Sequence, residues 1–210
     1  MCIISLVIIK NKFFMLGPSQ CGKTSLVFEL IKRRNEIINE QLTSIIYIYG
    51  VDTLEYHKMK TEHPEITFLA EFDDSKIPRN SLVIFDDRMS EIIGSENKSV
   101  TQFITRTVHH KKCSAILIFQ NIFAPKIRTI TLNSQYIVFF KTPRDCSSVA
   151  YLSKQMYPGK KKFLSKCYEI ATKRAHSYLF IDLSQTQVDS LRVRSDIFPV
   201  QGSFVFTPEM

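Results

Sequence analysis

The chain has 210 residues, a length that favours one domain rather than two. Hydrophobic residues make up 44% of the sequence and charged residues 23%, which excludes a disordered or fibrous protein. The five cysteines include no C-x-x-C pair, so the sequence predicts reduced thiols in an intracellular protein, without a disulfide framework or a zinc site. We expect a single domain over residues 1–210, with a core at about residues 12–182 and a basic C-terminal part.

The formal net charge of +8 is unevenly distributed. Residues 1–105 carry 12 basic and 14 acidic side chains, whereas residues 106–210 carry 16 basic and 6 acidic ones. This asymmetry favours an acidic partner for the second half, with nucleic acid as the first candidate, although a solvated basic surface gives the same pattern.

One apolar run, at residues 2–9, resembles a membrane segment. It is far shorter than the roughly 20 apolar residues that a spanning helix needs, and it lacks the basic start and the small-residue cleavage site of a signal peptide. We therefore expect a buried strand there and no association with a membrane.

Short apolar runs alternate with amphipathic stretches along the rest of the chain. The pattern predicts, in chain order, a strand at 12–16, a glycine loop, a helix from 23 to about 38, strands at 44–49, 66–69 and 82–85, a helix at 100–110, strands at 115–119 and 136–140, a helix at 146–156 and a strand at 178–181. Because the strands are apolar on both faces and alternate with helices, they predict an α/β fold with a mostly parallel central sheet that is covered on both sides.

A phosphate-binding loop is the strongest signal in the sequence. The octet G-P-S-Q-C-G-K-T fits the pattern G-x-x-x-x-G-K-[ST], follows an apolar strand and opens a helix. Glycines let the backbone curl until successive N–H groups point at a phosphate, and the helix N-terminus adds about half a positive charge. In this pattern Lys23 reaches the β- and γ-phosphates and the Thr24 hydroxyl binds Mg²⁺. The predicted nucleotide-binding residues are Gly17, Pro18, Ser19, Gln20, Cys21, Gly22, Lys23 and Thr24. For Cys21 a small filling side chain is favoured over a reactive thiol.

Two adjacent acids, Asp86 and Asp87, end the apolar run L-V-I-F. A buried strand delivers them to the carboxyl edge of the sheet, where ligands bind in such folds. Because neighbouring strand residues point in opposite directions, we expect different roles for the two. Asp86 would hold Mg²⁺, directly or through water, and Asp87 would polarise a water aimed at the γ-phosphate. A solvated acid pair at a strand end is the alternative.

The strand at 115–119 ends at Gln120 and Asn121. A polar side chain at this tip can contact the γ-phosphate and the attacking water, whereas a routine strand-end amide is the alternative. An additional strand with a polar sensor marks the additional-strand class of ATPases. The fold class predicted is therefore a three-layer α/β P-loop NTPase of the additional-strand, RecA/FtsK-like type.

An arginine often neutralises the transition-state charge of phosphoryl transfer, sometimes from a neighbouring subunit. On the helix at 100–110, Gln102, Arg106 and His110 recur at steps of four and so share one face. Arg106 is our first candidate for this catalytic role, and Arg128 and Arg144 are its rivals; an ordinary surface arginine is the alternative for each.

Three basic runs, at residues 109–112, 160–162 and 173–174, are candidate contacts for a phosphate backbone or simply solvated surface. The five histidines lack the spacing of metal ligands, so the sequence predicts no metal site beyond the magnesium that accompanies ATP.

Several of these stretches resemble one family. The octet, then L-V-I-F-D-D, then F-I-T-R-T-V-H-H-K-K-C-S-A-I-L-I-F-Q-N and R-T-I-T-L-N-S-Q-Y-I-V-F-F-K-T-P-R-D, are similar to the viral genome-packaging ATPases of the FtsK/HerA superfamily. The likeness is nearest to the versions in Polinton-like elements and adintoviruses, with the poxvirus enzyme more distant, and it runs from about residue 13 to about residue 199. There is no room for the barrel or winged-helix extensions of the cellular relatives, and residues 2–9 do not align.

The resemblance implies an ATP-driven motor that pumps double-stranded DNA into a preformed capsid. Such a motor works as a homo-oligomeric ring, as a pentamer or hexamer, with capsid proteins as further partners, at the virus assembly site in the host cell or on the virion. By position, Lys23 and Thr24 match the family's phosphate and magnesium residues, Asp86 and Asp87 its acidic pair, Gln120 its sensor and Arg106 its arginine finger.

Other functions are possible on the same loop. A nucleoside or small-molecule kinase is the main alternative, and the paired acids and the polar strand tip argue against it. A GTP switch needs an N-K-x-D base reader, which neither N-K-F-F nor N-K-S-V supplies. A non-catalytic binding module is disfavoured by the intact Lys23, Thr24, Asp86 and Asp87.

Overall fold

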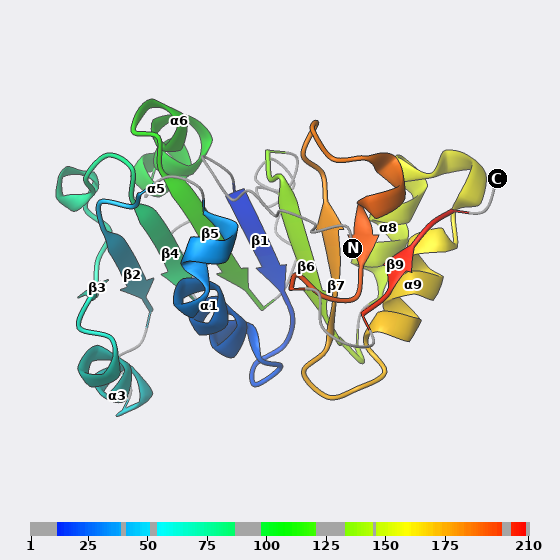
Figure 1. Cartoon of the computed structure of the whole chain (residues 1–210), viewed down its shortest axis with the longest axis horizontal. Coiled ribbons are helices and arrows are strands. Elements are labelled where there is room, and N and C mark those ends of the chain that lie inside the picture. Colours follow the sequence, from blue (N-terminus) through cyan, green and yellow to red (C-terminus); the bar gives the residue numbers. More distant parts are fainter. Residues whose placement is uncertain are drawn as a thin grey trace.

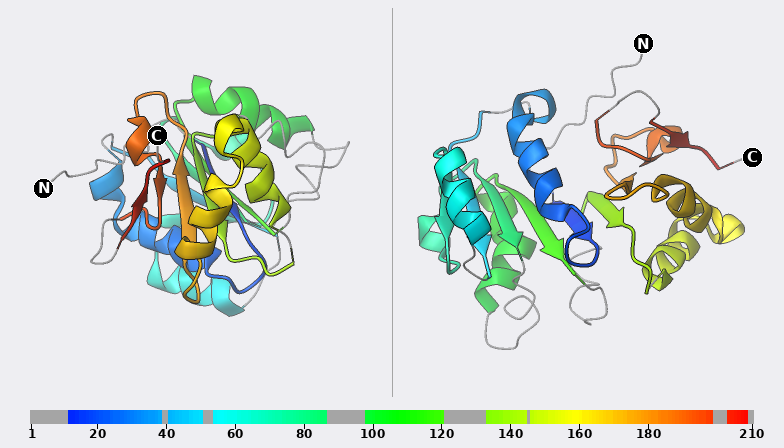
Figure 2. Two further views of the ribbon diagram at one scale, coloured as in Figure 1. Left: turned by 90° about the vertical axis from the view of Figure 1, so that its right-hand side faces the viewer. Right: turned by 90° about the horizontal axis from the view of Figure 1, so that it is seen from below.

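The computed structural model describes residues 12–38, 41–50, 54–86, 98–120, 133–144, 146–198 and 203–208. The strand expected at residues 2–9 lies outside this part of the chain. Within it, a nine-stranded sheet forms the middle of three layers, with helices on both faces (Figures 1 and 2).

Six neighbouring strands of the sheet are parallel, and the remaining three continue it in antiparallel pairs. The sheet order is β3 (Ile66–Leu69), β2 (Ile45–Tyr49), β4 (Leu82–Asp86), β5 (Ser114–Phe119), β1 (Lys12–Leu16), β6 (Tyr136–Phe140), β7 (Tyr178–Asp182), β8 (Val193–Arg194) and β9 (Val205–Phe206). Because β5 lies between β4 and β1, the sheet contains the additional strand that the sequence predicts. The fold is that of a three-layer P-loop NTPase.

Successive strand residues point to opposite faces and so divide the core in two. On one face, alternate strand residues pack with α1 (Lys23–Lys32) and with Tyr56 of α3 (Leu54–Glu62). On the other face they pack with a helical stretch made of α5 (Lys98–Gln102), a π-helical turn (Phe103–Thr107) and α6 (Val108–His110), and with α8 (Ser147–Met156) and α9 (Phe163–Ala171). Figure 2 shows these two helical layers on either side of the sheet.

Short elements complete the described part of the chain. They are α2 (Arg34–Ile37) and three 3-10 turns, at Asp74–Lys76, Pro158–Lys160 and Asp189–Leu191. No helix in the described ranges is long and apolar enough to span a membrane.

The predicted strands agree with the structure to within one residue at each end. The helix predicted from 23 to about 38 is interrupted, because the backbone of Arg33 leaves the helical region and α2 begins afterwards. The basic side chains Lys32, Arg33 and Arg34 gather at the C-terminus of α1, where the helix dipole stabilises positive charge. Helices α3 and α9 and the final strands β8 and β9 are additions to the predicted elements.

Candidate active site

The octet forms a tight loop between β1 and α1 at the carboxyl edge of the sheet. Two of its residues have left-handed backbones, Gln20 with φ 62° and Gly22 with φ 106°. The N-terminus of α1 has no side-chain cap and no acid in its first turn, so its N–H groups are left to an external anion. The loop therefore has the backbone of an anion-binding site.

The Lys23 side chain folds back over this loop. Its ammonium donates hydrogen bonds to the carbonyl oxygens of Gly17 (2.7 Å) and Pro18 (2.6 Å) and contacts Cys21 Sγ at 3.7 Å. Burial raises the pKa of the Cys21 thiol, with Lys23 acting in the opposite direction. A protonated thiol packed under the loop agrees with the filling role that the sequence favours for Cys21.

Asp86 lies at the end of β4, between β2 and β5, and is 6% exposed. Its Oδ2 atom accepts a hydrogen bond from the Tyr47 hydroxyl (2.5 Å) and another from the Tyr56 hydroxyl (3.0 Å). Burial, and then the negative charge of Asp86, raise the pKa of Tyr47 well above its usual value, so this phenol stays protonated and donates. Two tyrosines thus fix the orientation of the carboxylate.

Gln120 follows β5 directly and lies beside the start of the octet, because the Gly17 N–H bonds to the Phe119 carbonyl (3.2 Å). The register pairs Leu16 with Phe119. The structure therefore brings the loop, Asp86 and Gln120 to one edge of three adjacent strands. Asp87, Asn121 and Arg128 fall outside the described residues.

Two cavities flank the loop. One of about 710 Å³ extends toward α8 and is lined by Pro18, Ser19, Gln120 and Arg144 among others. The second, of about 610 Å³, begins at the N-terminus of α1 and is lined by Gln20, Gly22, Lys23, Thr24, Ser25, Leu26, Phe140, His176 and Tyr178. Together they give the loop the space that an extended ligand needs on both of its sides.

The π-helical turn that carries Arg106 joins α5 to α6, which lie toward the opposite edge of the sheet from the loop between β1 and α1 (Figure 1). Arg106 is exposed on this turn, and α6 after it leads to the edge of the sheet where β4 and β5 begin (Figure 1). Gln102 and His110 are exposed as well, as the shared face predicts. Of the rival arginines, Arg144 lines the cavity beside the loop.

The donor set at this edge fits Mg²⁺. A hydroxyl and a carboxylate are hard oxygen ligands, and Mg²⁺ binds through one or two carboxylates together with substrate phosphates and waters. Thr24 is the second residue of α1, and Asp86 ends a strand two positions away from β1 in the sheet. Both residues lie at the edge of the sheet that the loop 17–24 occupies.

No protein-family model and no curated protein matches the sequence. Solved structures do match. The chain is similar to the genome packaging NTPase B204 from Sulfolobus turreted icosahedral virus 2 in complex with ATP-gammaS, with a TM-score of 0.57 and 14% identity over 96% of this chain and 98% of that chain. It is also similar to B204, the DNA-packaging ATPase from Sulfolobus Turreted Icosahedral Virus, with a TM-score of 0.56 and 12% identity over 97% and 100% of the two chains. At these identities the likeness is one of fold, and it extends over nearly all of both chains.

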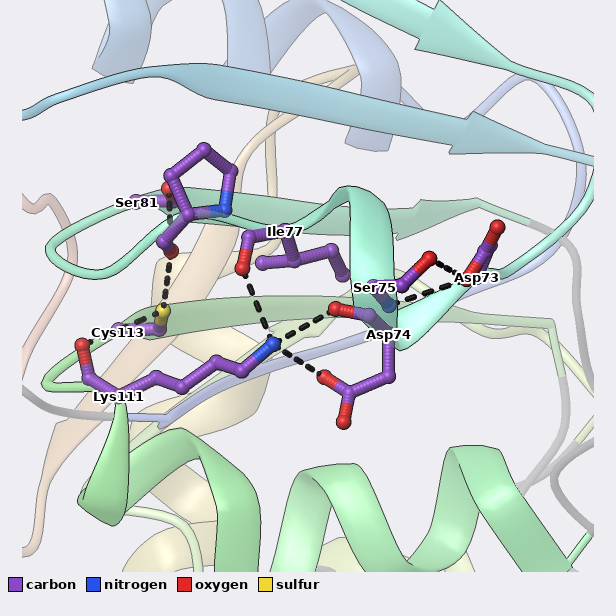
Figure 3. A network of polar contacts seen from close by, with 8 residues as sticks. Asp73, Asp74, Ser75, Ile77, Ser81, Lys111 and Cys113 are labelled. Atoms are coloured by element: carbon purple, nitrogen blue, oxygen red, sulfur yellow. Dashed lines mark hydrogen bonds and ion pairs between the residues drawn. The ribbon is translucent and has the colours of Figure 1, made fainter.

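The basic run at residues 109–112 has a structural role at one position. The Lys111 ammonium bonds to the Asp74 carbonyl (2.6 Å), the Asp74 carboxylate (2.7 Å) and the Ile77 carbonyl (3.0 Å), as Figure 3 shows. Lys111 therefore connects the segment before β4 to the end of α6, and its positive charge is neutralised inside the fold. In the same run, burial and then the positive charge of Lys12 lower the pKa of His109.

The sequence did not identify Tyr47, Tyr56, His176 or Tyr178 as site residues. The two tyrosines at Asp86 come from β2 and α3, and the other two side chains come from the segment before β7 and from β7 itself. The alternation of Tyr47 and Tyr49 on β2 was the one available signal, because it places both rings on one face of the sheet.

Proposed function

We propose that this chain is an ATP-hydrolysing motor that translocates double-stranded DNA and packages a viral genome into capsids. The observation that carries the proposal is the position of β5, which presents Gln120 between the loop strand β1 and the acid-bearing strand β4. Hydrolysis needs a polar group at that position to orient a water, whereas a kinase must exclude water and bind an acceptor. The two solved structures described above support the proposal, since one is a genome packaging NTPase in complex with ATP-gammaS and the other a DNA-packaging ATPase.

In this proposal the loop 17–24 binds the triphosphate of ATP. The N–H groups of the loop and the α1 N-terminus face the phosphates, and Lys23 exchanges its bonds to the Gly17 and Pro18 carbonyls for the β- and γ-phosphate oxygens. We assign the cavity of about 610 Å³ to the nucleoside end, because it begins at Thr24 and Ser25 and offers the His176 and Tyr178 rings.

Thr24 and Asp86 would hold Mg²⁺. Bound there, Mg²⁺ supplies charge neutralisation for the β- and γ-phosphate oxygens. Because Asp86 Oδ2 already accepts two tyrosine hydroxyls, we assign Asp86 a contact through a bound water rather than a direct one. Tyr47 and Tyr56 then act as positioning residues for the carboxylate.

Asp87 is our candidate base for the attacking water, and Gln120 its partner at the γ-phosphate. We propose that the arginine comes from a neighbouring subunit. Arg106 is our first choice, because the helical stretch α5–α6 that carries it lies away from the loop of its own chain. The protein would then act as a homo-oligomeric ring of five or six copies, each a single domain over residues 1–210. We place this motor in the FtsK/HerA superfamily, with capsid proteins as further partners at the virus assembly site or on the virion.

The test measures ATP hydrolysis by the full chain with and without duplex DNA. Duplex DNA should stimulate hydrolysis, and Lys23→Ala should abolish it. Lys32→Ala, which changes an exposed lysine at the other end of α1, serves as the matched control and should leave both rates unchanged. Transfer of the γ-phosphate to added nucleosides, or hydrolysis that duplex DNA never stimulates, would contradict the proposal.

A further inference from the structure

A groove of about 880 Å³ lies at the far end of the sheet, away from the nucleotide loop. It runs between the turn Pro158–Lys160, helix α9 and the final strand β9 (Figure 1). We call it the α9–β9 groove; its main lining residues are Lys160, Lys161, Lys162, Lys166, Ile170 and Val205. None of these residues belongs to the candidate active site.

The groove is strongly basic and its charges are unpaired. All four lysines are exposed, and none of their ammonium groups has a hydrogen-bond or ion-pair partner within the part of the chain that the structure describes. Residues 154–174 contain seven Lys and Arg side chains and a single acid, Glu169. Elsewhere the protein neutralises a half-buried lysine internally, as Lys111 with Asp74 shows. The groove therefore presents a positive field without an internal counter-charge.

The groove also exposes the apolar side chains of Ile170 and Val205, and Phe204 lines the hollow next to it. Ile170 is 44% exposed, Phe204 54% and Val205 43%, and these are three of the five large apolar residues that the described ranges leave exposed. A smaller hollow of about 290 Å³ continues from Ile170 and Phe204 to Lys173 and Arg174. Exposed apolar side chains flanked by lysines, by Lys173 and Arg174 and by Asp196 have the composition of a protein interface, which is apolar at its centre and polar at its rim.

Among the described strands, the strand beside these side chains pairs with one neighbour. β9 pairs with β8 through Val193 with Phe206 and Arg194 with Val205, and it ends the order of the described strands. An edge strand offers backbone N–H and C=O groups to an extended segment, with alternate side chains directed to pockets.

We propose that the α9–β9 groove binds an extended, acidic segment of a partner protein that carries apolar side chains. Acidic side chains on the segment complement the four lysines, and its apolar side chains cover Ile170, Phe204 and Val205. Duplex DNA also carries negative charge. Proteins contact it mainly through its phosphates and sugars, however, so DNA would bury these apolar side chains against polar groups instead of apolar ones. This inference stands independently of the proposed motor function.

The experiment selects short random peptides displayed on phage against the full chain, with counter-selection on the double variant Ile170→Ser/Phe204→Ser. We expect the selected peptides to combine Asp or Glu with aliphatic or aromatic residues. A labelled selected peptide should lose at least about tenfold in affinity, about 1.4 kcal/mol, for Lys161→Glu/Lys162→Glu and again for Ile170→Ser/Phe204→Ser. Lys32→Glu and Val188→Ser change an exposed lysine and an exposed valine elsewhere, and should leave the affinity within about twofold.

All these substitutions are at exposed positions, and unchanged melting temperatures will show that the variants fold. Selected peptides without acids, or peptides that bind the variants as tightly as the wild type, would overturn the proposal. Duplex DNA that displaces the peptide, and whose binding falls in the lysine variant but not in the apolar variant, would assign the groove to DNA instead. A change in sedimentation mass in either groove variant would assign it to a second copy of the chain.

Discussion

The pair of tyrosines at Asp86 gives the most direct test of how this site is organised. Tyr47→Phe removes one hydroxyl and keeps a ring that stacks on Phe28 and Phe68, with centroid distances of 5.8 and 5.4 Å. The substitution therefore removes the 2.5 Å bond to Asp86 Oδ2 while the aromatic packing remains. A hydrogen bond to a charged group contributes about 1.5–3 kcal/mol. That range predicts a roughly 10- to 100-fold weaker response to Mg²⁺, as is typical when a residue behind a metal ligand is changed.

The assay is a magnesium titration of the binding of a fluorescent ATP analogue, repeated with ATP hydrolysis as the readout. We expect the half-saturating Mg²⁺ concentration to rise in Tyr47→Phe, while binding of the nucleotide without Mg²⁺ stays close to wild type. Tyr56→Phe removes the second, longer bond of 3.0 Å and should have a smaller effect.

Tyr49→Phe is the matched control, because Tyr49 stacks on Tyr56 but its hydroxyl accepts a hydrogen bond from Lys60. It removes a neighbouring hydroxyl from the same strand and face and keeps both tyrosine hydrogen bonds to Asp86. Equal magnesium titrations for Tyr47→Phe, Tyr49→Phe and the wild type would refute the positioning role of Tyr47.

Three further substitutions test the loop and the core. Gly17→Ala should abolish nucleotide binding and lower the free energy of unfolding by about 1–3 kcal/mol, because the new Cβ would lie 2.6 Å from two side-chain atoms. Gly159→Ala is the control, because a Cβ there would have no atom within 4 Å. It should change neither nucleotide binding nor urea unfolding. Lys111→Met removes three hydrogen bonds and should lower the free energy of unfolding by about 1–2 kcal/mol, because the Asp74 carboxylate and the Ile77 carbonyl lose this donor while the Asp74 carbonyl keeps the Ile77 N–H. Lys112→Met changes the exposed neighbour and should show no such loss. Lys12 is fully buried, and its ammonium has no hydrogen-bond partner among the described residues. Burial lowers the pKa of Lys12 below 10.5, so the folded chain binds fewer protons than the unfolded chain at alkaline pH. The free energy of unfolding should therefore rise as pH rises toward 10.5. Lys12→Met should raise stability at neutral pH and reduce that slope in urea unfolding series, and an unchanged slope would contradict the assignment.

The strands could be predicted because each apolar run ends abruptly at a glycine or at a polar or charged residue. The strand at 12–16 stops at a glycine, and the strand at 136–140 stops at Lys141 followed by a proline two residues later. Helix α3 has few apolar residues, and it is held by contacts that only the folded chain makes, such as the Tyr56 ring against Tyr47 and Tyr49. Strands β8 and β9 are two residues long each, too short for any alternation to be seen.

The site was predictable to the extent that it is built from strand ends. The octet, Asp86 and Gln120 each follow an apolar run, and parallel strands bring their carboxyl ends to one edge. The tyrosines at Asp86 depend on the register of β2 against β4, which pairs Tyr49 with Asp86 and sets Tyr47 two residues back on the same face. Sequence periodicity likewise predicted which face of the helix carries Arg106, but it did not predict toward which edge of the sheet that helix would lie.

The two glycines of the octet are required for different physical reasons. The reason at Gly17 depends on a distant element, helix α9. Gly22 has a φ of 106°, a backbone conformation that side chains rarely adopt. Gly17 is instead confined by packing, since a Cβ there would meet Phe140 at 2.6 Å. The backbone around Phe140 is in turn held by Tyr168 of α9, whose hydroxyl donates to the Phe140 carbonyl (3.0 Å) and accepts from the Thr142 N–H (2.7 Å). Because α9 carries Lys166 and Ile170 of the groove as well as Tyr168, the helix joins the two candidate binding surfaces through two hydrogen bonds and one aromatic ring.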